Sequence, residues 1–263
     1  MRSSFALVLT ALIACGPLDA AAQSAAAPTK PSSAPNISVG ALYEYLAPGQ
    51  STLLKRIHNS GDATAFVRVN ITEIVYAADG SHHEIPVDTR GIGQATASAT
   101  SVLLASPARL IVPIKGQQGT RLLYQGPREH ERYYRVRFIP VAPEKTDDFA
   151  LSEEEGEQYK AALGAGVQVL TGYGAVLIVR PAETRYDTQL SQAGSTYTVR
   201  NNGNSIIVLD SFQECTDART CTDARKIHLR PGRSEVIELQ QGHRYRFELI
   251  EGDAVPRKVE VVG

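Results

Sequence analysis

The chain has 263 residues, of which 43% are hydrophobic and 21% charged, so it can form one large or two ordinary globular domains. Its formal net charge of -1 excludes a generally basic protein that binds nucleic acid or an anionic membrane surface. Trp is absent and aromatic residues make up only 6%, which argues against an aromatic-lined platform for sugars or bases.

The N-terminus has the pattern of an export signal. Arg2 precedes the short apolar run "FALVLTALIA" at residues 5–14, and small residues follow. A run of about ten residues is too short to span a bilayer, so we expect residues 1–22 to be a signal peptide cut after Ala22. A second interpretation reads "LIAC" as a lipoprotein box in which Cys15 is acylated. Both interpretations predict an exported protein.

Short β-type runs separated by turns begin after a flexible lead-in. Residues 23–35 are rich in Ala, Pro and Ser without periodicity, as in a linker. Asp79-Gly80 is a hairpin signal, and in the run "RYYRVRFIPV" apolar residues alternate with arginines, as in a half-solvated antiparallel strand. This first series of predicted strands covers residues 37–46, 51–59, 63–76, 109–114, 119–126 and 132–141.

The pattern stops at residues 142–165, an acidic connection that is only briefly compatible with a helix. The alternating run "GVQVLTGYGAVLIVRP" at 166–181 follows, and a second β series begins after Pro181. Short strands with hairpin turns and little helix predict an all-β protein of sandwich type. We therefore expect two domains, residues 36–181 and residues 182–263.

The two remaining cysteines are predicted to form a disulfide. Cys215 and Cys221 lie in the polar stretch "QECTDARTCTD", and an exported protein matures in an oxidising compartment. A metal site would need more ligands than two cysteines among Asp and Thr. The bridge would fix the tip of one hairpin.

The sequence carries no recognisable catalytic motif. A nucleophile elbow, a phosphate loop, Cys-x-x-Cys and His-Glu-x-x-His are all missing from it. His82 and His83 are interpreted as solvated loop residues, not as metal ligands. We therefore expect a protein that is not an enzyme and that uses no cofactor, metal or nucleotide.

An ordered set of segments resembles the periplasmic chaperones that assemble pili, the PapD-like superfamily of the chaperone–usher pathway. The set is "LLASPARLIVPIKGQQGTRLLYQG", "EHERYYRVRFIPV", a long loop, "YGAVLIVRP" and a second β domain. The stretch "NNGNSIIVLDSFQEC" with its nearby second Cys is similar to the alternate class of these chaperones. The resemblance covers essentially the whole mature chain. It implies two immunoglobulin-like domains in an L arrangement, located in the periplasm.

The resemblance also implies a function, which is to lend a strand to a pilin subunit whose own sandwich lacks one and to deliver the subunit to an outer-membrane usher. Alternate side chains of the lent strand fill the subunit's groove, whereas Leu177 and Val179 are expected to fill the chain's own core. The donor residues implied are Val167, Val169 and Thr171, with Leu170 as the alternative if a bulge shifts the register, together with Tyr173.

A charge network between the domains is implied as well. Glu129 and Arg180 match the family's positions, and Asp253, or else Glu251, would be the third member. Such a network would fix the angle between the domains, and the alternative is that Arg180 is a plain surface charge beside the linker.

The chain departs from the family where the subunit's terminal carboxylate is usually anchored. Glu44 and Val176 occupy the positions of the two usual cations, and neither can bind an anion. The carboxylate is then either not anchored or held by other cations, for which Arg135, Arg137, Lys55 and Arg56 are candidates. A planar guanidinium is the better carboxylate clamp, which favours Arg135.

One competing interpretation is a two-domain structural subunit, or minor pilin, of a surface fibre. Such a subunit needs a terminal segment that complements its neighbour. The lead-in at residues 23–35 lacks the long alternating apolar pattern of a donor segment. The sequence therefore favours the chaperone.

Overall fold

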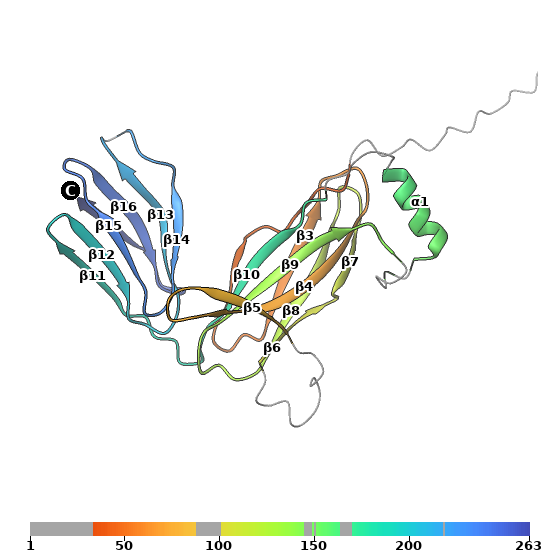
Figure 1. Ribbon diagram of the computed structural model, residues 1–263, viewed down its shortest axis with the longest axis horizontal. Coiled ribbons are helices and arrows are strands. Elements are labelled where there is room, and N and C mark those ends of the chain that lie inside the picture. The colour runs from red at the N-terminus through yellow and green to blue at the C-terminus, as the bar shows by residue number, and fades with distance from the viewer. Residues whose placement is uncertain (1–33, 88–100, 145–148, 150, 164–169, 218) are drawn as a thin grey trace, which may run out of the picture. The chain divides into compact units, whose positions relative to one another are not determined.

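A computed structural model describes residues 34–87, 101–144, 149, 151–163, 170–217 and 219–263 (Figure 1). Residues Pro31–Gly263 form one compact unit. The predicted signal peptide, most of the lead-in and Cys15 lie outside the described residues. Within the described part of the chain, no helix is both long and apolar enough to cross a bilayer.

The strands that precede Pro181 form two sheets (Figure 1). The first sheet has the order β1-β3-β8-β6, and the second has the order β2-β10-β9-β4-β5, with β7 also paired to β4. Every pairing described in them is antiparallel except that of β10 with β2. Their bounds are β1 Ile37–Ser38, β2 Tyr43–Leu46, β3 Thr52–Asn59, β4 Ala65–Tyr76, β5 His82–Pro86, β6 Val102–Ser106, β7 Arg109–Val112, β8 Gln117–Gln125, β9 Arg132–Val141 and β10 Tyr173–Val179.

The strands that follow Pro181 form two further sheets. One has the order β11-β12-β15 and the other the order β14-β13-β16-β17, all antiparallel. A bulge in β13 is centred on Ser211, whose φ of 53° is unusual for a residue with a side chain. The bounds are β11 Thr188–Ala193, β12 Thr196–Asn201, β13 Ile207–Cys215, β14 Arg225–Leu229, β15 Ser234–Glu238, β16 Arg244–Ile250 and β17 Arg257–Val262.

Each pair of sheets encloses its own apolar core, which is what period-two alternation produces. Strand β9 shows it most clearly, because Tyr134, Val136 and Phe138 are buried while the arginines between them are half-buried. The second pair of sheets encloses a separate cluster that includes Val199, Leu209, Phe247 and Leu249. The all-β prediction is confirmed, with two sandwiches of immunoglobulin type.

The turns follow the sequence signals. Asp79 and Gly80 join β4 to β5, where Gly80 has a φ of 95° and the Asp79 carboxylate accepts a hydrogen bond from the Ser81 N–H at 2.9 Å. Pro231-Gly232 joins β14 to β15, with Gly232 at a φ of 74°. A residue with a Cβ would be strained at either glycine.

The helix α1 (Glu153–Leu163) lies in the connection between β9 and β10. It fills part of the acidic stretch that the sequence marks as only briefly compatible with a helix. No described strand pairing joins the sheets before Pro181 to those after it. We propose that Pro181 separates two domains, residues 36–181 and residues 182–263.

Candidate functional site

Strand β10 presents two different apolar faces. Ala175, Leu177 and Val179 point into the first core, as the sequence predicts for the last two. Val176 and Ile178 point the other way, into a small cluster with Ile74 and Ile206. Because Ile206 follows Pro181, this cluster joins the first sandwich to the second.

The first half of β10 has a neighbour on one side only. Residues Tyr173–Val179 all pair with β9, whereas β2 pairs only from Val176 onward. The N–H of Val176 donates to the Leu42 carbonyl at 2.7 Å, so even-numbered residues direct their backbone groups towards β2. By this alternation the N–H and C=O of Gly174 face a side that no described strand occupies. Gly174 is exposed, so β10 offers a free sheet edge there.

A proline ends the pairing on the other side. Tyr173 is opposite Phe138 in the β9 ladder, so the next hydrogen-bonded pair would join Thr171 to Pro140. Pro140 has no N–H to donate, and the described β10 ladder stops at Tyr173. Residues 170–172, which precede Tyr173, are therefore not paired as a strand with the chain's own sheet.

The predicted donor residues are only partly covered by the structure. Val167 and Val169 lie outside the described residues. Leu170 is half-buried, Thr171 is exposed, and Tyr173 packs against the first core. Their role stays a prediction.

Two of the predicted anchor cations share one carboxylate on the same sheet. Glu84 of β5 contacts Arg137 at 2.7 Å through Nη2 and Arg135 at 3.4 Å through Nε. The Thr72 hydroxyl donates to Glu84 at 2.6 Å, and this bond with the arginines holds the pKa of Glu84 below its usual value. Two guanidinium groups and one carboxylate leave a net positive charge at the cluster.

The side chain of Arg135, from β9, lies over Gly174 on one face of the sheet. It is directly opposite Val176, and its Cδ lies 3.3 Å from where a Cβ on Gly174 would stand. Its side chain is 30% exposed, and Glu84 is the only anion that contacts it among the described residues. The terminal nitrogens of Arg135 are thus available to a second carboxylate.

Lys55 and Arg56 are placed differently. Lys55 is only 3% exposed, and its ammonium contacts the Ala41 carbonyl and, at 2.6 Å, the Glu44 carboxylate. Glu44 thus compensates a buried lysine from within the chain. Arg56 is exposed on the outer face of β3. Neither placement suits an anchor as well as that of Arg135.

The acid that connects the strands before Pro181 with those after it is Glu131. The sequence suggests Glu129 for this role. Glu129 is exposed, whereas the Glu131 carboxylate accepts hydrogen bonds from the Ser205 hydroxyl and from the Ile206 N–H at 2.9 Å. The Tyr133 hydroxyl donates to the same carboxylate. Burial raises the pKa of Glu131 above its usual value.

Arg180 forms an ion pair with Asp253, with 3.2 Å between Nη1 and Oδ1. Asp253 is the first of the two acids that the sequence suggests for this role. Arg180 is 6% exposed, while the Asp253 side chain is 84% exposed, so the pair itself contributes little to stability. Glu251, the other acid considered, accepts a hydrogen bond from Thr188 at 2.6 Å.

A ring stack adds a contact that sequence reasoning missed. Tyr43 of β2 stacks on His228 of β14, with ring centroids 3.7 Å apart and planes 17° apart. Nearby, the Arg230 guanidinium lies 3.4 Å from the ring centroid of Tyr76. No local pattern signals such pairs, because their members are far apart in the sequence.

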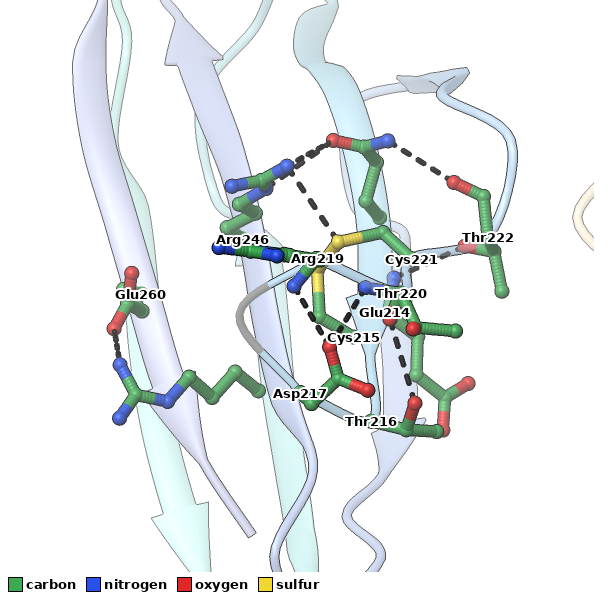
Figure 2. Close-up of a disulfide and its surroundings, with 12 residues drawn as sticks. Glu214, Cys215, Thr216, Asp217, Arg219, Thr220, Cys221, Thr222, Arg246 and Glu260 are labelled. Atoms are coloured by element: carbon green, nitrogen blue, oxygen red, sulfur yellow. Dashed lines mark hydrogen bonds and ion pairs between the residues drawn. A yellow bond between two sulfur atoms is a disulfide. The ribbon is translucent and has the colours of Figure 1, made fainter.

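The predicted disulfide is present. Cys215 and Cys221 are bonded across a sequence separation of six residues, at the end of β13 (Figure 2). Inside the loop the Asp217 carboxylate accepts hydrogen bonds from the N–H groups of Arg219 and Thr220, at 2.7 and 2.9 Å. The bridge therefore closes a loop that already has its own hydrogen bonds.

No family model matches the chain, but curated fimbrial chaperones are similar to it in sequence. It is 27% identical over 202 residues to the probable fimbrial chaperone EcpB of Klebsiella pneumoniae, which covers 75% of this chain and 79% of the relative. EcpB of Escherichia coli O1:K1 is 27% identical over 201 residues, with the same coverage.

Solved structures show the same fold. The class 5 fimbriae chaperone CfaA is 17% identical with a TM-score of 0.54, covering 86% of this chain and 98% of that one. The E. coli chaperone DraB is 15% identical with a TM-score of 0.51, covering 86% and 96%. The comparisons confirm the predicted resemblance of this chain to fimbrial chaperones.

Proposed function

We propose that this chain is a periplasmic chaperone that binds fimbrial subunits by donating the β10 edge and hands them to an outer-membrane usher. The observation that carries the proposal is the free edge of β10 at Gly174. Unpaired backbone groups at a sheet edge are a template for a strand from another chain. A subunit that lacks one strand would supply the complementary edge.

The side-chain parity of β10 supports the choice of donor residues. Thr171 and Tyr173 share the parity of Ala175 and Leu177, which point into the first core. Val167 and Val169 continue that parity in the sequence. Apolar residues on this face would enter the subunit's groove as a continuation of the chaperone's own core, with Leu170 replacing them if a bulge shifts the register.

Arg135 is proposed as the group that receives the subunit's terminal carboxylate. It lies beside Gly174 and contacts Glu84 only through Nε. A guanidinium can bind a carboxylate with two parallel hydrogen bonds, whereas a lysine offers a point charge. Arg137 would add to the positive potential without direct contact, because its Nη2 is already 2.7 Å from Glu84.

We propose that a set of polar contacts fixes the angle between the two sandwiches. The set consists of the contacts of Glu131, Arg180 and Asp253. Partly buried polar contacts of this kind specify geometry more than they add stability. The handover to the usher would need no nucleotide, since the free energy comes from exchanging one donor strand for a better one.

The test is co-expression in the periplasm with a fimbrial subunit from the same locus, followed by co-purification. We expect Val167→Asp/Val169→Asp to lose the subunit, because a charge cannot enter an apolar groove. Gln168→Asp, which adds a charge at the opposite parity, should retain it. If the folded double variant still holds the subunit, the donor role is wrong and a structural role in a fibre becomes the better explanation.

A second comparison tests the anchor. Arg135→Ala is expected to weaken subunit binding about tenfold, as the loss of one charged hydrogen-bonded contact does. Arg56→Ala removes the same charge from an exposed position and should leave binding unchanged. Equal losses in both variants would mean that only the overall charge matters.

A further inference from the structure

The carboxylate of Glu84 reaches across a neighbouring strand to the two arginines of β9. Glu84 lies on the edge strand β5, and β4 separates that strand from β9. Its Oε2 accepts a hydrogen bond from the Thr72 hydroxyl at 2.6 Å and lies 2.7 Å from Nη2 of Arg137, while its Oε1 lies 3.4 Å from Nε of Arg135. The Thr72 hydroxyl accepts a hydrogen bond from Nη1 of Arg137 at 3.2 Å. Three side chains therefore hold Glu84 in place.

The guanidinium of Arg135 has Glu84 on one side and Gly174 on another. Glu84 contacts Nε, while Nη1 lies 4.0 Å from where a Cβ on Gly174 would stand. The N–H groups of a guanidinium lie in one plane and point in different directions, so one guanidinium can bind two carboxylates at once. Arg135 can therefore receive a carboxylate of the subunit while it keeps its contact with Glu84.

The internal carboxylate lowers the positive charge that a subunit would meet. Glu84 is the only acidic side chain that contacts Arg135 or Arg137 within the part of the chain that the structure describes. The bond from Thr72 and the two arginines hold the pKa of Glu84 below its usual value, so Glu84 is ionised at neutral pH. An ionised Glu84 repels any second carboxylate that binds the same guanidinium. Its side chain is only 23% exposed, so solvent screens this repulsion incompletely.

We propose that Glu84 weakens the binding of the subunit's terminal carboxylate to Arg135 and so allows the subunit to be released. The inference rests on the proposed function and on Arg135 as the carboxylate anchor. Glu84 contacts no subunit itself and acts through Arg135. Transfer of a subunit depends on the difference between its affinities for two donor strands, and a weaker anchor on the chaperone increases that difference.

The experiment measures how fast a subunit leaves the chaperone. The full chain is co-expressed with a fimbrial subunit from the same locus, and transfer of the subunit from the purified complex to an excess of wild-type chain with a different tag is followed over time. Glu84→Gln keeps an oxygen for the Thr72 hydroxyl and removes the charge, so it is expected to slow release about tenfold. Glu84→Met, which also lacks the charge, should act in the same way if Glu84→Gln does not fold.

Glu73→Gln is the matched control. Glu73 contacts Arg132 at 2.7 Å, and it lies opposite Tyr134, whereas Thr72 lies opposite Arg135. By the alternation of a strand, Glu73 is therefore on the other face of the same sheet. The control removes one charge from an arginine pair of the same kind, and it should leave the release rate unchanged.

Two further measurements test whether the effect passes through Arg135 and the terminal carboxylate. In the background of Arg135→Ala, Glu84→Gln should have little effect, because the residue through which Glu84 acts is gone. A subunit extended by two glycines at its C-terminus carries its carboxylate away from Arg135, and Glu84→Gln should then leave its release unchanged. Slower release that persists in either case would overturn the proposal, because Glu84 would then act on another group of the subunit.

The outcomes also separate this inference from the proposed function. If Glu84→Gln releases the subunit at the wild-type rate or faster, Glu84 only holds Arg135 in position, and the inference is wrong while the chaperone function stands. If the wild-type chain holds no subunit, both proposals fail.

Discussion

At the scale of single residues, Lys55 shows how a charged side chain can be buried in a sandwich. Its ammonium is buried and is satisfied by the Ala41 carbonyl and the Glu44 carboxylate. We expect Lys55→Met to lower the free energy of unfolding by about 1–3 kcal/mol, because Glu44 and the carbonyl lose their partner. Urea unfolding followed by circular dichroism measures the difference.

The matched variant is Lys55→Met/Glu44→Leu, which removes both charges. It should regain much of the lost stability, since replacing a buried ion pair by apolar groups is often neutral. A double variant as unstable as Lys55→Met alone would mean that the loss comes from packing and not from the unpaired Glu44, whose side chain is 27% exposed.

The charge network shows where residue-level prediction fails. The sequence points to Glu129, but Glu131 makes the contacts with Ser205 and Ile206. The two acids have the same parity and lie in the short connection from β8 to β9. The sequence of this connection does not determine its backbone conformation, and therefore does not determine which of the two carboxylates points towards Ser205. Arg180 was easier to predict, because the Arg-Pro ending fixes it at the end of β10.

At the scale of elements, most strands could be predicted because alternation and turn residues are local signals. The alternating burial of β9 and the Gly80 hairpin follow from them. The partners of a strand are not local. Glu84 reaches the arginines of β9 only because β5 and β9 flank β4 in the sheet, and no period in the sequence encodes that order. The contact of Tyr159 in α1 with Phe66 in β4 is non-local in the same way.

The disulfide hairpin gives a prediction at this scale. Closing a loop of this length stabilises a fold by about 2 kcal/mol in the chain-entropy model. We expect Cys215→Ala/Cys221→Ala to lose less than that, because the loop keeps the hydrogen bonds of Asp217 and one between Thr216 and Thr220 (Figure 2). Unfolding in urea, with and without a reducing agent, gives the value.

The control is the same titration of the double variant with reductant, which should have no further effect. Amide exchange should quicken near the loop and stay slow in β16, whose pairing with β17 does not involve the loop. Loss of protection throughout the second sandwich would instead make the bridge a requirement for its fold.

At the scale of the whole molecule, the contacts across Pro181 combine an apolar cluster, a buried carboxylate and a ring stack. Ile178 and Ile206 belong to the cluster, Glu131 is the carboxylate, and Tyr43 stacks on His228. Apolar burial is insensitive to pH, whereas the stack is not, because an imidazole that leaves it can take up a proton below about pH 6.5. The contacts between the two sandwiches should therefore become less stable in mild acid.

His228 is the group that should respond. Burial lowers the pKa of His228 from 6.5 to about 4, with a smaller effect of Lys226 in the same direction and an opposing one of Asp210. Its Nε2 is buried without a hydrogen-bond partner among the described residues, so a proton there has no acceptor. Above pH 6.5 the residue is neutral in both the folded and the unfolded chain and contributes no pH dependence.

Between pH 6.5 and 4 the unfolded chain takes up a proton at His228 that the folded chain does not, so stability falls as the pH falls. The loss is at most about 3 kcal/mol, and less in practice because the ring is partly exposed. Urea unfolding at pH 7.5 and pH 5 should show it in the wild type and much less in His228→Phe, which keeps a ring against Tyr43. Other groups titrate equally in both proteins, so the difference between them isolates this one. Equal pH dependence in the two proteins would show that His228 accepts its proton in the folded state and that the stack does not sense pH.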